Sequence, residues 1–243
     1  MRLSHECQLQ SVHAVPGARK PVIRLMLQNR RVEISVNNTA ASINSKFMKM
    51  LCSDHLFHHI FKFTRYILGE IDVIRTGRLS SYSVGIALFC YIQSQGAVSS
   101  LEKNLENTPR SDLKDEFCQL PWDYRLPETI SFSWNCTSKQ AAIDTVLKIF
   151  IGFCYWLATV ENVLDSRSCQ ILGKNDFLAK YGLTEKHFKI GPYMIADPFE
   201  VEHNTTGAVT DRSAYQIRKA LKSIQIKAKI RRLLGNFFIR NWF

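Results

Sequence analysis

The hydrophobic pattern along the chain changes from a two-residue period to a helical period near residue 39. Before that point, residues 21–36 predict two β-strands joined by a turn at 28–30. In the second strand apolar and polar residues alternate, so one face is apolar and the other carries the carboxylate of Glu33. The sequence therefore begins with a small piece of half-buried sheet.

The following segments have the spacing of amphipathic helices. Residues 40–51 and 56–68 predict two helices, separated by Ser53 and Asp54, which are residue types that cap helix N-termini. A third helix is predicted over 82–92, where the apolar residues are so frequent that we expect the helix to be buried.

The second half of the sequence predicts one long helix and several shorter segments. Ser138 can cap a helix that runs to about Thr159, because the apolar residues between them follow helical spacing. The remaining expectations are loops at 99–115, 121–129 and 192–199, a short strand pair within 160–172, and a final basic helix capped by Asp211 or Ser213.

A strand pair followed by a run of helices predicts a broken α/β or α+β domain joined to a helical one, and we take the fold class as α+β. We expect a small sheet domain over 1–39, a helical central domain over 40–212 and a basic helix or tail over 213–243. With 243 residues, of which 46% are hydrophobic, the chain can bury one good core or two small ones.

Positive charge is concentrated at the C-terminal end of a chain whose formal net charge is +11. No acidic residue follows Asp211, whereas the cations continue and alternate with Ile, Leu, Phe and Trp. This segment can contact an RNA backbone or cover the core as a terminal amphipathic helix, and its pattern does not choose between the two. An anionic membrane surface is a more distant alternative. The candidate RNA contacts are Lys227, Lys229, Arg231 and Arg232.

The cysteines and the apolar runs indicate an intracellular protein. Seven cysteines are scattered singly and form no CxxC pair, as is typical of free thiols in a reducing compartment. The first residues lack the apolar stretch of a secretory signal, and the longest apolar run, 149–160, is too short to span a bilayer. We therefore expect no membrane partner.

Two groups of residues have spacings that could suit a metal ion. Glu70 and Asp72 are spaced like a carboxylate pair on a strand, and His55 and His59 are spaced like zinc ligands on a helix. We interpret both groups as solvated surface residues. The carboxylates follow a helix in a loop, and the histidines have no third ligand nearby in the sequence.

Three segments resemble the terminal uridylyltransferase and poly(A) polymerase-like family of RNA nucleotidyltransferases. VEISVNNTAASIN at 32–44 is similar to the family's third-carboxylate strand and the asparagines that follow it. GRLSSYSVGIALFCYIQ at 77–93 resembles its Leu-Ser-Ser-Tyr helix start, and IADPFEVEHNTTGAVT at 195–210 resembles its Asp-Pro-Phe-Glu…His-Asn signature. The three occur in the family's order and approximate spacing, across nearly the whole chain.

The resemblance implies a fold for each part of the chain. Residues 1–39 would hold the last strands of a nucleotidyltransferase sheet. Residues 40–212 would form a mainly helical central domain of the poly(A) polymerase type, with the poly(A)-polymerase-associated segment over about 143–206.

The resemblance also implies roles for four residues in the first half of the chain. Tyr82 would stack under the incoming base, because an aromatic ring offers a π face to any base. Ser81 would donate its hydroxyl to the triphosphate. Asn38 and Asn44 would hydrogen-bond the ribose and the base edge, since an amide both donates and accepts.

Further nucleotide contacts are implied by the signature at 195–210 and by the second predicted helix. His203 would read the base and favour uracil over adenine, with Asp197 and Glu200 behind it. The family carries basic residues on the helix before the Ser-Ser-Tyr loop, where Arg65 is the plausible phosphate contact here.

Catalysis in the family needs Mg²⁺ or Mn²⁺ ions held by three carboxylates. Glu33 matches the third carboxylate, as a catalytic and metal-binding residue, in a position where the family typically has Asp. The Gly-Ser motif and the Asp-x-Asp pair that precede it in the family are not found before residue 21. We therefore expect the metal site of this chain to be incomplete.

The resemblance implies an RNA 3′-end terminal nucleotidyltransferase that adds UMP or AMP from UTP or ATP. We expect this chain to be a fragment or a divergent form that transfers no nucleotide by itself. The alternative is a non-catalytic nucleotide-binding, RNA-binding or scaffold module derived from the family. A nuclear or cytoplasmic location is expected, a mitochondrial one stays open, and no obligate oligomer is implied.

Overall fold

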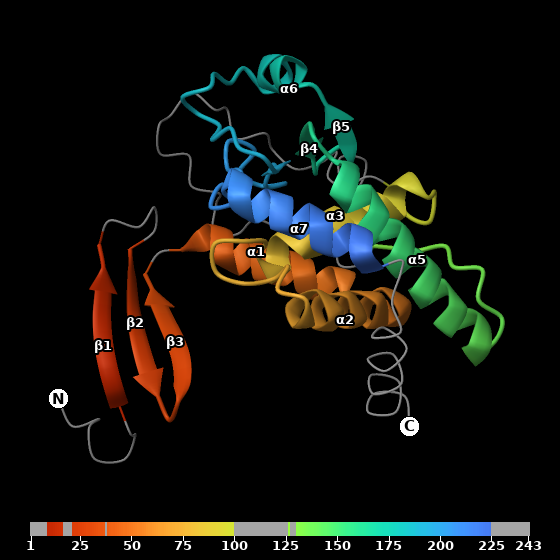
Figure 1. Ribbon diagram of the computed structural model, residues 1–243, viewed down its shortest axis with the longest axis horizontal. Helices are drawn as coiled ribbons and strands as arrows, with labels where there is room; N and C mark the ends of the chain where they lie inside the picture. Colours follow the sequence, from red (N-terminus) through yellow and green to blue (C-terminus); the bar gives the residue numbers. More distant parts are fainter. Residues whose placement is uncertain (1–8, 17–20, 37, 100–125, 127–129, 225–243) are drawn as a thin grey trace. The chain divides into compact units, whose positions relative to one another are not determined.

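The computed structural model describes residues 9–16, 21–36, 38–99, 126 and 130–224 (Figure 1). The chain divides into two compact units, and the boundary falls inside helix α1, between Ile43 and Asn44. The predicted domain bounds stay predictions. The same is true of the predicted loops at 99–115 and 121–129 and of the four predicted RNA contacts, because those segments lie largely or wholly outside the described residues. These contacts are Lys227, Lys229, Arg231 and Arg232.

The first unit contains a three-stranded antiparallel sheet in the order β1-β2-β3, formed by β1 (Leu9–Val15), β2 (Val22–Leu27) and β3 (Arg30–Ser35). The predicted strand pair is confirmed. Its turn is formed by Gln28 and Asn29, both at positive φ (47° and 60°), which matches the right-handed twist of a hairpin. Strand β1 was not predicted, because polar and small residues interrupt its alternation.

The register of this sheet gives it two different faces. Ile23 pairs with Ile34 and Leu25 pairs with Val32 on one face, whereas Arg24 pairs with Glu33 on the other. The predicted alternation is therefore confirmed, but β3 is exposed along its whole length, and Ile23 and Ile34 remain 46% and 47% exposed. The apolar face of the sheet is thus largely open to solvent, which is unusual for a contiguous set of aliphatic side chains.

The helical unit is built from long helices whose starts follow the capping rules. Asp54 caps α2, Ser80 caps α3 and Ser138 caps α5, each by accepting a backbone N–H of the first turn. The helices of the described chain are α1 (Thr39–Leu51), α2 (His55–Glu70), α3 (Ser81–Ser94), α5 (Lys139–Thr159), α6 (Lys174–Tyr181) and α7 (Asp211–Ser223).

Two expectations about this unit need correction. Helix α7 is capped by Thr210 rather than by Asp211 or Ser213, and Ser213 completes a reciprocal capping box with it. The segment predicted as a loop at 192–199 contains the short strand β6 (Met194–Ile195), which pairs in parallel with β4 (Val163–Asp165). A two-residue strand is too short to show an alternating pattern.

A second small sheet has the order β5-β4-β6, where β5 is Gln170–Leu172. The predicted strand pair within 160–172 is therefore confirmed as β4 and β5. At the end of β4 the fully buried carboxylate of Asp165 accepts hydrogen bonds from Lys180 Nζ at 2.8 Å and from Ser168 Oγ at 2.7 Å. The bond from Lys180 ties the unpredicted helix α6 to the sheet.

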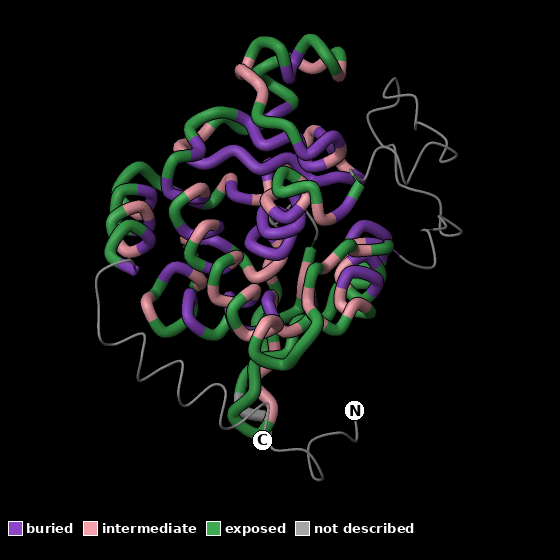
Figure 2. Tube along the Cα trace, turned by 90° about the vertical axis from the view of Figure 1, so that its right-hand side faces the viewer, coloured by how far each residue is buried: buried purple, intermediate pink, exposed green. Residues whose placement is uncertain are grey.

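The core of the helical unit lies around α3, which is buried at most of its positions (Figure 2). Phe63 of α2 meets Phe150 of α5 edge to face, with ring centroids 4.9 Å apart. Such a pair adds about 1 kcal/mol to the burial of its two rings. The predicted burial of the third helix is therefore confirmed.

Helix α5 is long and apolar enough to cross a membrane, judged by its 21 residues and a mean hydropathy of 1.6, and no other described helix is. It packs against α2, α3 and α7, and Phe150, Phe153 and Leu157 on it are buried. Core helices of this kind pass the same test, so the absence of a membrane partner stays a prediction.

Candidate functional site

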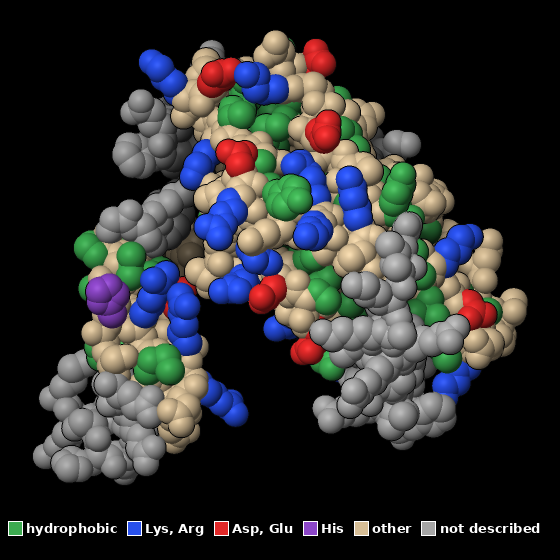
Figure 3. Space-filling model, in the orientation of Figure 1, with side chains coloured by type: hydrophobic (Ala, Val, Ile, Leu, Met, Phe, Trp, Pro, Cys, Tyr) green, Lys and Arg blue, Asp and Glu red, His purple; other side chains and the backbone are tan. Residues whose placement is uncertain are grey.

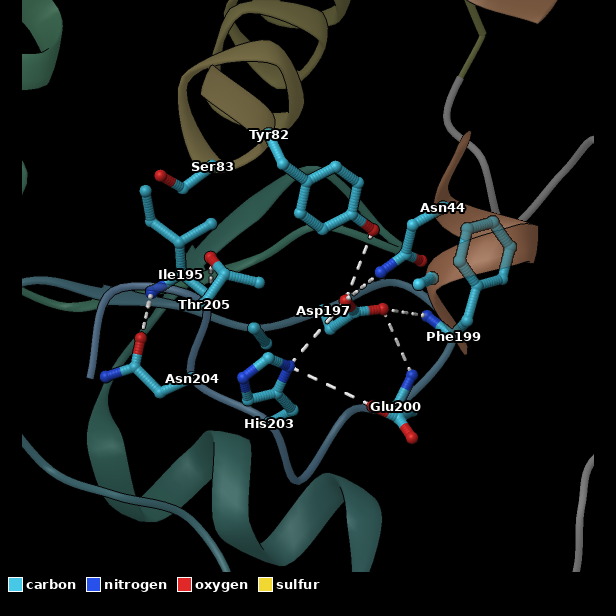
Figure 4. A network of polar contacts seen from close by, with 12 residues as sticks. Asn44, Tyr82, Ser83, Ile195, Asp197, Phe199, Glu200, His203, Asn204 and Thr205 are labelled. Atoms are coloured by element: carbon cyan, nitrogen blue, oxygen red, sulfur yellow. Dashed lines mark hydrogen bonds and ion pairs between the residues drawn. The ribbon is translucent and has the colours of Figure 1, made fainter. Parts of the chain in front are cut away.

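The buried carboxylate of Asp197, which follows β6 directly, accepts four hydrogen bonds (Figure 4). Its Oδ1 accepts the backbone N–H groups of Phe199 at 2.9 Å and Glu200 at 3.2 Å. Its Oδ2 accepts the hydroxyl of Tyr82 and the amide Nδ2 of Asn44, both at 3.2 Å. Both oxygens are therefore saturated, as a buried charge requires.

Three distant segments of the chain supply this cluster. Asn44 lies on the inward side of α1, beside the buried residues Ile43 and Phe47. Tyr82 lies in the first turn of α3, whose start is fixed by the capping box between Ser80 and Ser83. The local caps and helix faces thus determine where the two side chains meet the carboxylate.

Tyr82 is held in its un-ionised form. Burial raises the pKa of its hydroxyl, and the nearby negative charge of Asp197 raises it further. The hydroxyl therefore remains a donor to the carboxylate at any physiological pH, and this bond fixes the direction of the ring.

His203 approaches the same carboxylate from the far end of the loop. Its Nδ1 lies 3.8 Å from Asp197 Oδ2 and 4.0 Å from Glu200 Oε2. Two backbone bonds close the loop around it, from Asp197 N to the His203 carbonyl at 2.9 Å and from His203 N to the Glu200 carbonyl at 2.7 Å. The imidazole is therefore fixed in front of two carboxylates.

Asn204 fastens the loop that carries His203. Its Oδ1 accepts the N–H of Ile195 at 3.1 Å, and its Nδ2 donates to the carbonyls of Lys189 at 2.9 Å and Tyr193 at 3.1 Å. The sequence showed Asn204 only as part of the signature. The signal that could have identified its role is that an amide following a functional residue commonly bonds local backbone.

Two polar atoms of the cluster are buried and have no hydrogen-bond partner among the described residues. They are Oδ1 of Asn44 and Nδ1 of His203. Most buried polar side-chain atoms in native proteins are paired, so an unpaired acceptor and an unpaired ring nitrogen beside one carboxylate need an explanation. A bound ligand that carries both donors and acceptors would supply the missing partners.

The other predicted nucleotide contacts, Ser81, Arg65 and Asn38, form no bond to this cluster among the described residues. Ser81 is half-buried at the first position of α3, next to Tyr82. Arg65 is exposed on α2, with no bond to the cluster in the described part of the chain. Asn38 belongs to the sheet unit, where its Nδ2 donates to Ser35 Oγ and its Oδ1 accepts the N–H of Ala41. Their roles stay predictions.

The carboxylate of Glu33, the predicted catalytic and metal-binding residue, forms ion pairs with two arginines. Its Oε1 accepts from Arg24 Nε at 2.8 Å and from Arg31 Nη2 at 2.5 Å. The hydrogen bond from Arg31 is the main cause that holds the pKa of this carboxyl below its usual range, and Arg24 adds to it. A cation at Glu33 would have to compete with two guanidinium groups.

The described residues do not fit a magnesium site. They contain no group of three His, Cys, Asp or Glu side chains that could hold a metal ion, and Glu33 is paired as described. Glu70, Asp72 and His55 are exposed, whereas His59 is half-buried, and the interpretation of the two groups as solvated surface residues stays a prediction.

Comparison with known proteins gives related sequences and related structures, although no protein-family model matches the chain. The chain is 26% identical, over 223 residues, to the speckle targeted PIP5K1A-regulated poly(A) polymerase of Xenopus tropicalis, which covers 85% of the chain and 25% of that protein. The corresponding protein of Rattus norvegicus is 22% identical over 216 residues, covering 86% and 24%.

Two solved structures share the fold. A complex of mtPAP with GTP superposes with a TM-score of 0.66 at 16% identity, over 94% of this chain and 48% of that one. The Cid1 poly(U) polymerase, as a mutant bound to MgATP, superposes with a TM-score of 0.57 at 21% identity, over 89% and 66%. The chain is a relative of the terminal nucleotidyltransferases.

This relationship confirms the predicted family resemblance and the α+β fold class. The chain spans about a quarter of the length of the curated relatives it matches and about half of mtPAP. The mtPAP structure contains GTP and the Cid1 structure contains MgATP. Both of these fold neighbours therefore bind a nucleotide, in the second case together with a divalent metal.

The buried tyrosine predicts how stability depends on pH. Tyr82 ionises near pH 10 in the unfolded chain but keeps its proton in the folded one, so above about pH 10 the folded state binds more protons and stability falls with rising pH. Urea unfolding from about pH 8 to about pH 11 measures this loss. Tyr82→Phe should reduce the slope above about pH 10, and an equal slope in wild type and variant would contradict the assignment.

Proposed function

We propose that the helical unit selects the nucleotide for an RNA 3′-terminal nucleotidyltransferase that adds UMP or AMP. The observation that carries the proposal is the convergence of Asn44, Tyr82 and His203 on the carboxylate of Asp197, with Asn44 Oδ1 and His203 Nδ1 left unpaired. Convergent polar groups beside an aromatic ring suit a base and its ribose better than an apolar ligand.

Each residue of the cluster has a role that its chemistry allows. The hydroxyl of Tyr82 is anchored by Asp197, so the ring offers a face on which a base can stack. The free Oδ1 of Asn44 accepts a hydrogen bond from a ribose hydroxyl, while its Nδ2 is already bonded to Asp197. Asp197 acts as the positioning residue for both.

His203 supports a preference for UTP over ATP. A ring N–H donor complements the O4 acceptor of uracil and meets a donor, the N6 amino group, on adenine. The loop closure fixes the backbone of His203, and its Nδ1 lies 3.8 Å from Asp197 Oδ2, so the ring is presented at the cluster. We therefore propose UTP as the preferred nucleotide and ATP as the weaker one.

The state of Glu33 favours a second candidate for this chain, a module that binds nucleotide and RNA without transfer. Its carboxylate is tied to Arg24 and Arg31, and the described residues provide no further metal ligands around it. The two candidates differ in one measurement. Extension of a labelled RNA by the purified chain with Mg²⁺ and UTP would favour the enzyme, and nucleotide binding without extension would favour the module.

The relatives also support a place in the cell. The curated matches are described as speckle targeted, which supports the nuclear alternative among the expected locations. The RNA 3′ end as a partner follows from the same relatives, which are poly(A) polymerases by name.

Removing the imidazole of His203 tests the base preference. His203→Ala should weaken UTP binding about tenfold, as expected for one buried hydrogen bond, and leave ATP binding within about twofold. Isothermal titration with each nucleotide measures both affinities. His58→Ala, which removes an exposed histidine of α2, is the matched control and should change neither. A His203→Ala variant that keeps the wild-type ratio of the two affinities would remove His203 from the site.

A further inference from the structure

Three cations and one tyrosine line the solvent-facing side of α7. We call them the α7 stripe; all four side chains are exposed, and Tyr215 is 68% exposed. They are spaced by three, four and three residues, so they share one side of the helix over a length of about 15 Å. The stripe consists of Arg212, Tyr215, Lys219 and Lys222.

The field over this side of α7 is positive. The helix carries one acidic residue, Asp211 in its first turn, where a carboxylate complements the helix dipole. Figure 3 shows Lys and Arg side chains gathered over α7, with few Asp and Glu side chains among them. A polyanion that follows the helix therefore meets cations with little repulsion.

The opposite side of α7 holds the helix rigidly in the unit. Ala214, Ile217 and Leu221 are buried, and the helix packs against α5. Arg218 points inward, donates to the Pro192 carbonyl at 2.8 Å, and lies over the ring of Tyr193 with its guanidinium carbon 4.8 Å from the centroid. Arg218 is therefore part of the support, and the stripe is presented from a fixed helix.

The stripe is close to the nucleotide cluster along the chain. The N-cap Thr210 follows His203 by seven residues, so the first turn of α7 is close to the cluster along the chain. Arg78, in the loop that leads to Ser80 and α3, donates to the side chain of Gln216 on α7 at 2.6 Å. An RNA strand whose 3′ end lies next to the bound nucleotide can therefore continue along α7.

The chemistry of the stripe favours single-stranded RNA over a membrane. Insertion into a membrane surface needs an exposed apolar face, but the apolar side of α7 is buried in the unit. Cations interleaved with an exposed aromatic ring form the arrangement that tracks a phosphate backbone and stacks a base. We propose that the α7 stripe binds the backbone of the RNA strand upstream of its 3′ end, with Tyr215 stacking one base; this rests on the proposed function.

Salt-dependent binding of RNA tests the stripe. Fluorescence anisotropy with a labelled single-stranded oligouridine and the full chain gives the affinity from about 50 mM to about 200 mM salt. The double variant Lys219→Gln/Lys222→Gln should lose about tenfold in affinity at the lower salt, and its slope of log affinity against log salt should be shallower by about 1.4. Tyr215→Ala should lose about tenfold with the slope unchanged, because stacking releases no counterions.

A matched control carries the same change in charge on another helix. Lys139→Gln/Lys148→Gln on α5 should lose less than about twofold in RNA affinity. An equal loss in both double variants, or an unchanged slope in the stripe variant, would overturn the proposal. It would also be overturned if the stripe variants bound RNA normally but no longer sedimented with phosphatidylserine-containing vesicles.

Nucleotide affinity separates this proposal from the proposed function. The stripe variants should bind UTP as the wild type does, and His203→Ala should bind RNA as the wild type does. If the wild type bound no nucleotide while the stripe variants still had a reduced RNA affinity, the proposed nucleotide site would be contradicted and the proposed RNA site on α7 would be supported. If UTP bound and the stripe variants kept their RNA affinity, the stripe would fail alone.

Discussion

Asp197→Asn should lower the free energy of unfolding by about 3 kcal/mol and weaken UTP binding at least about a hundredfold. The asparagine can still accept the two backbone bonds on one oxygen, but its amino group would face the donors of Tyr82 and Asn44. Two buried donors would lose their acceptor and meet a third donor. Each unpaired buried group costs about 1–3 kcal/mol.

The size of this effect distinguishes Asp197, which organises the loop, from a neighbouring carboxylate of the same loop. Glu200→Gln makes the same change of charge in the same loop, but its side chain accepts none of those four bonds, so it should cost less than about 1 kcal/mol. Urea unfolding measures both variants, and titration with UTP measures their binding. If Asp197→Asn and Glu200→Gln were equally stable, Asp197 would not organise the site.

Phe47→Ala should destabilise the helical unit by about 4 kcal/mol and weaken nucleotide binding as well. Phe47 is 1% exposed and packs edge to face against Phe89 of α3, with centroids 6.0 Å apart, and against Phe199, with centroids 5.3 Å apart. Phe199 is two residues after Asp197 and donates its N–H to that carboxylate. The cavity would therefore open directly behind the Asp197 loop.

A second core phenylalanine separates stability from binding. Phe177 of α6 is fully buried and packs against Phe188. Phe177→Ala should therefore lower the free energy of unfolding by a similar amount, about 4 kcal/mol. It should lower the UTP affinity of the folded protein less than Phe47→Ala does. Phe177 shares a cluster with Met194 and Ala196, which precede the Asp197 loop, whereas Phe47 packs directly on Phe199 inside the loop. Differential scanning fluorimetry and titration with UTP measure the two quantities. Equal losses of affinity in Phe47→Ala and Phe177→Ala would contradict the special position of Phe47.

The sequence predicted the elements whose signals are local. Strands β2 and β3 followed from alternation, and α2, α3 and α5 followed from periodicity, with caps expected for α2 at Asp54 and for α5 at Ser138. Elements that depend on tertiary pairing were missed. Strand β6 exists because Met194 and Ile195 pair with β4, and two residues carry no pattern of their own.

The candidate site was predicted in its members but not in its organisation. The motifs named Asn44, Tyr82, Asp197, Glu200 and His203, and the structure brings these five together. That one carboxylate accepts from two helices and two backbone groups could not be read from the sequence, because it depends on the packing of α1 against the β6 loop. Their binding roles remain predictions.

The surface side of the chain was the hardest to predict. The cations after residue 211 were read as one basic segment, yet the structure divides them, with Arg218 bonded inward to the Pro192 carbonyl and Lys219 exposed beside it. Neighbouring residues on a helix point in directions that differ by about 100°. Only the position of the buried face decides which cation meets solvent.

The open apolar face of the β1–β3 sheet has a consequence for every thermodynamic measurement on this polypeptide. A three-stranded sheet with its aliphatic side uncovered buries too little hydrocarbon to be held firmly, so it is expected to melt separately from the helices. A single transition midpoint for the whole chain would then mix two processes. With Trp122 and Trp242 replaced by phenylalanine, the fluorescence of the remaining Trp134 and Trp156, which both belong to the helical unit, follows the unfolding of that unit alone.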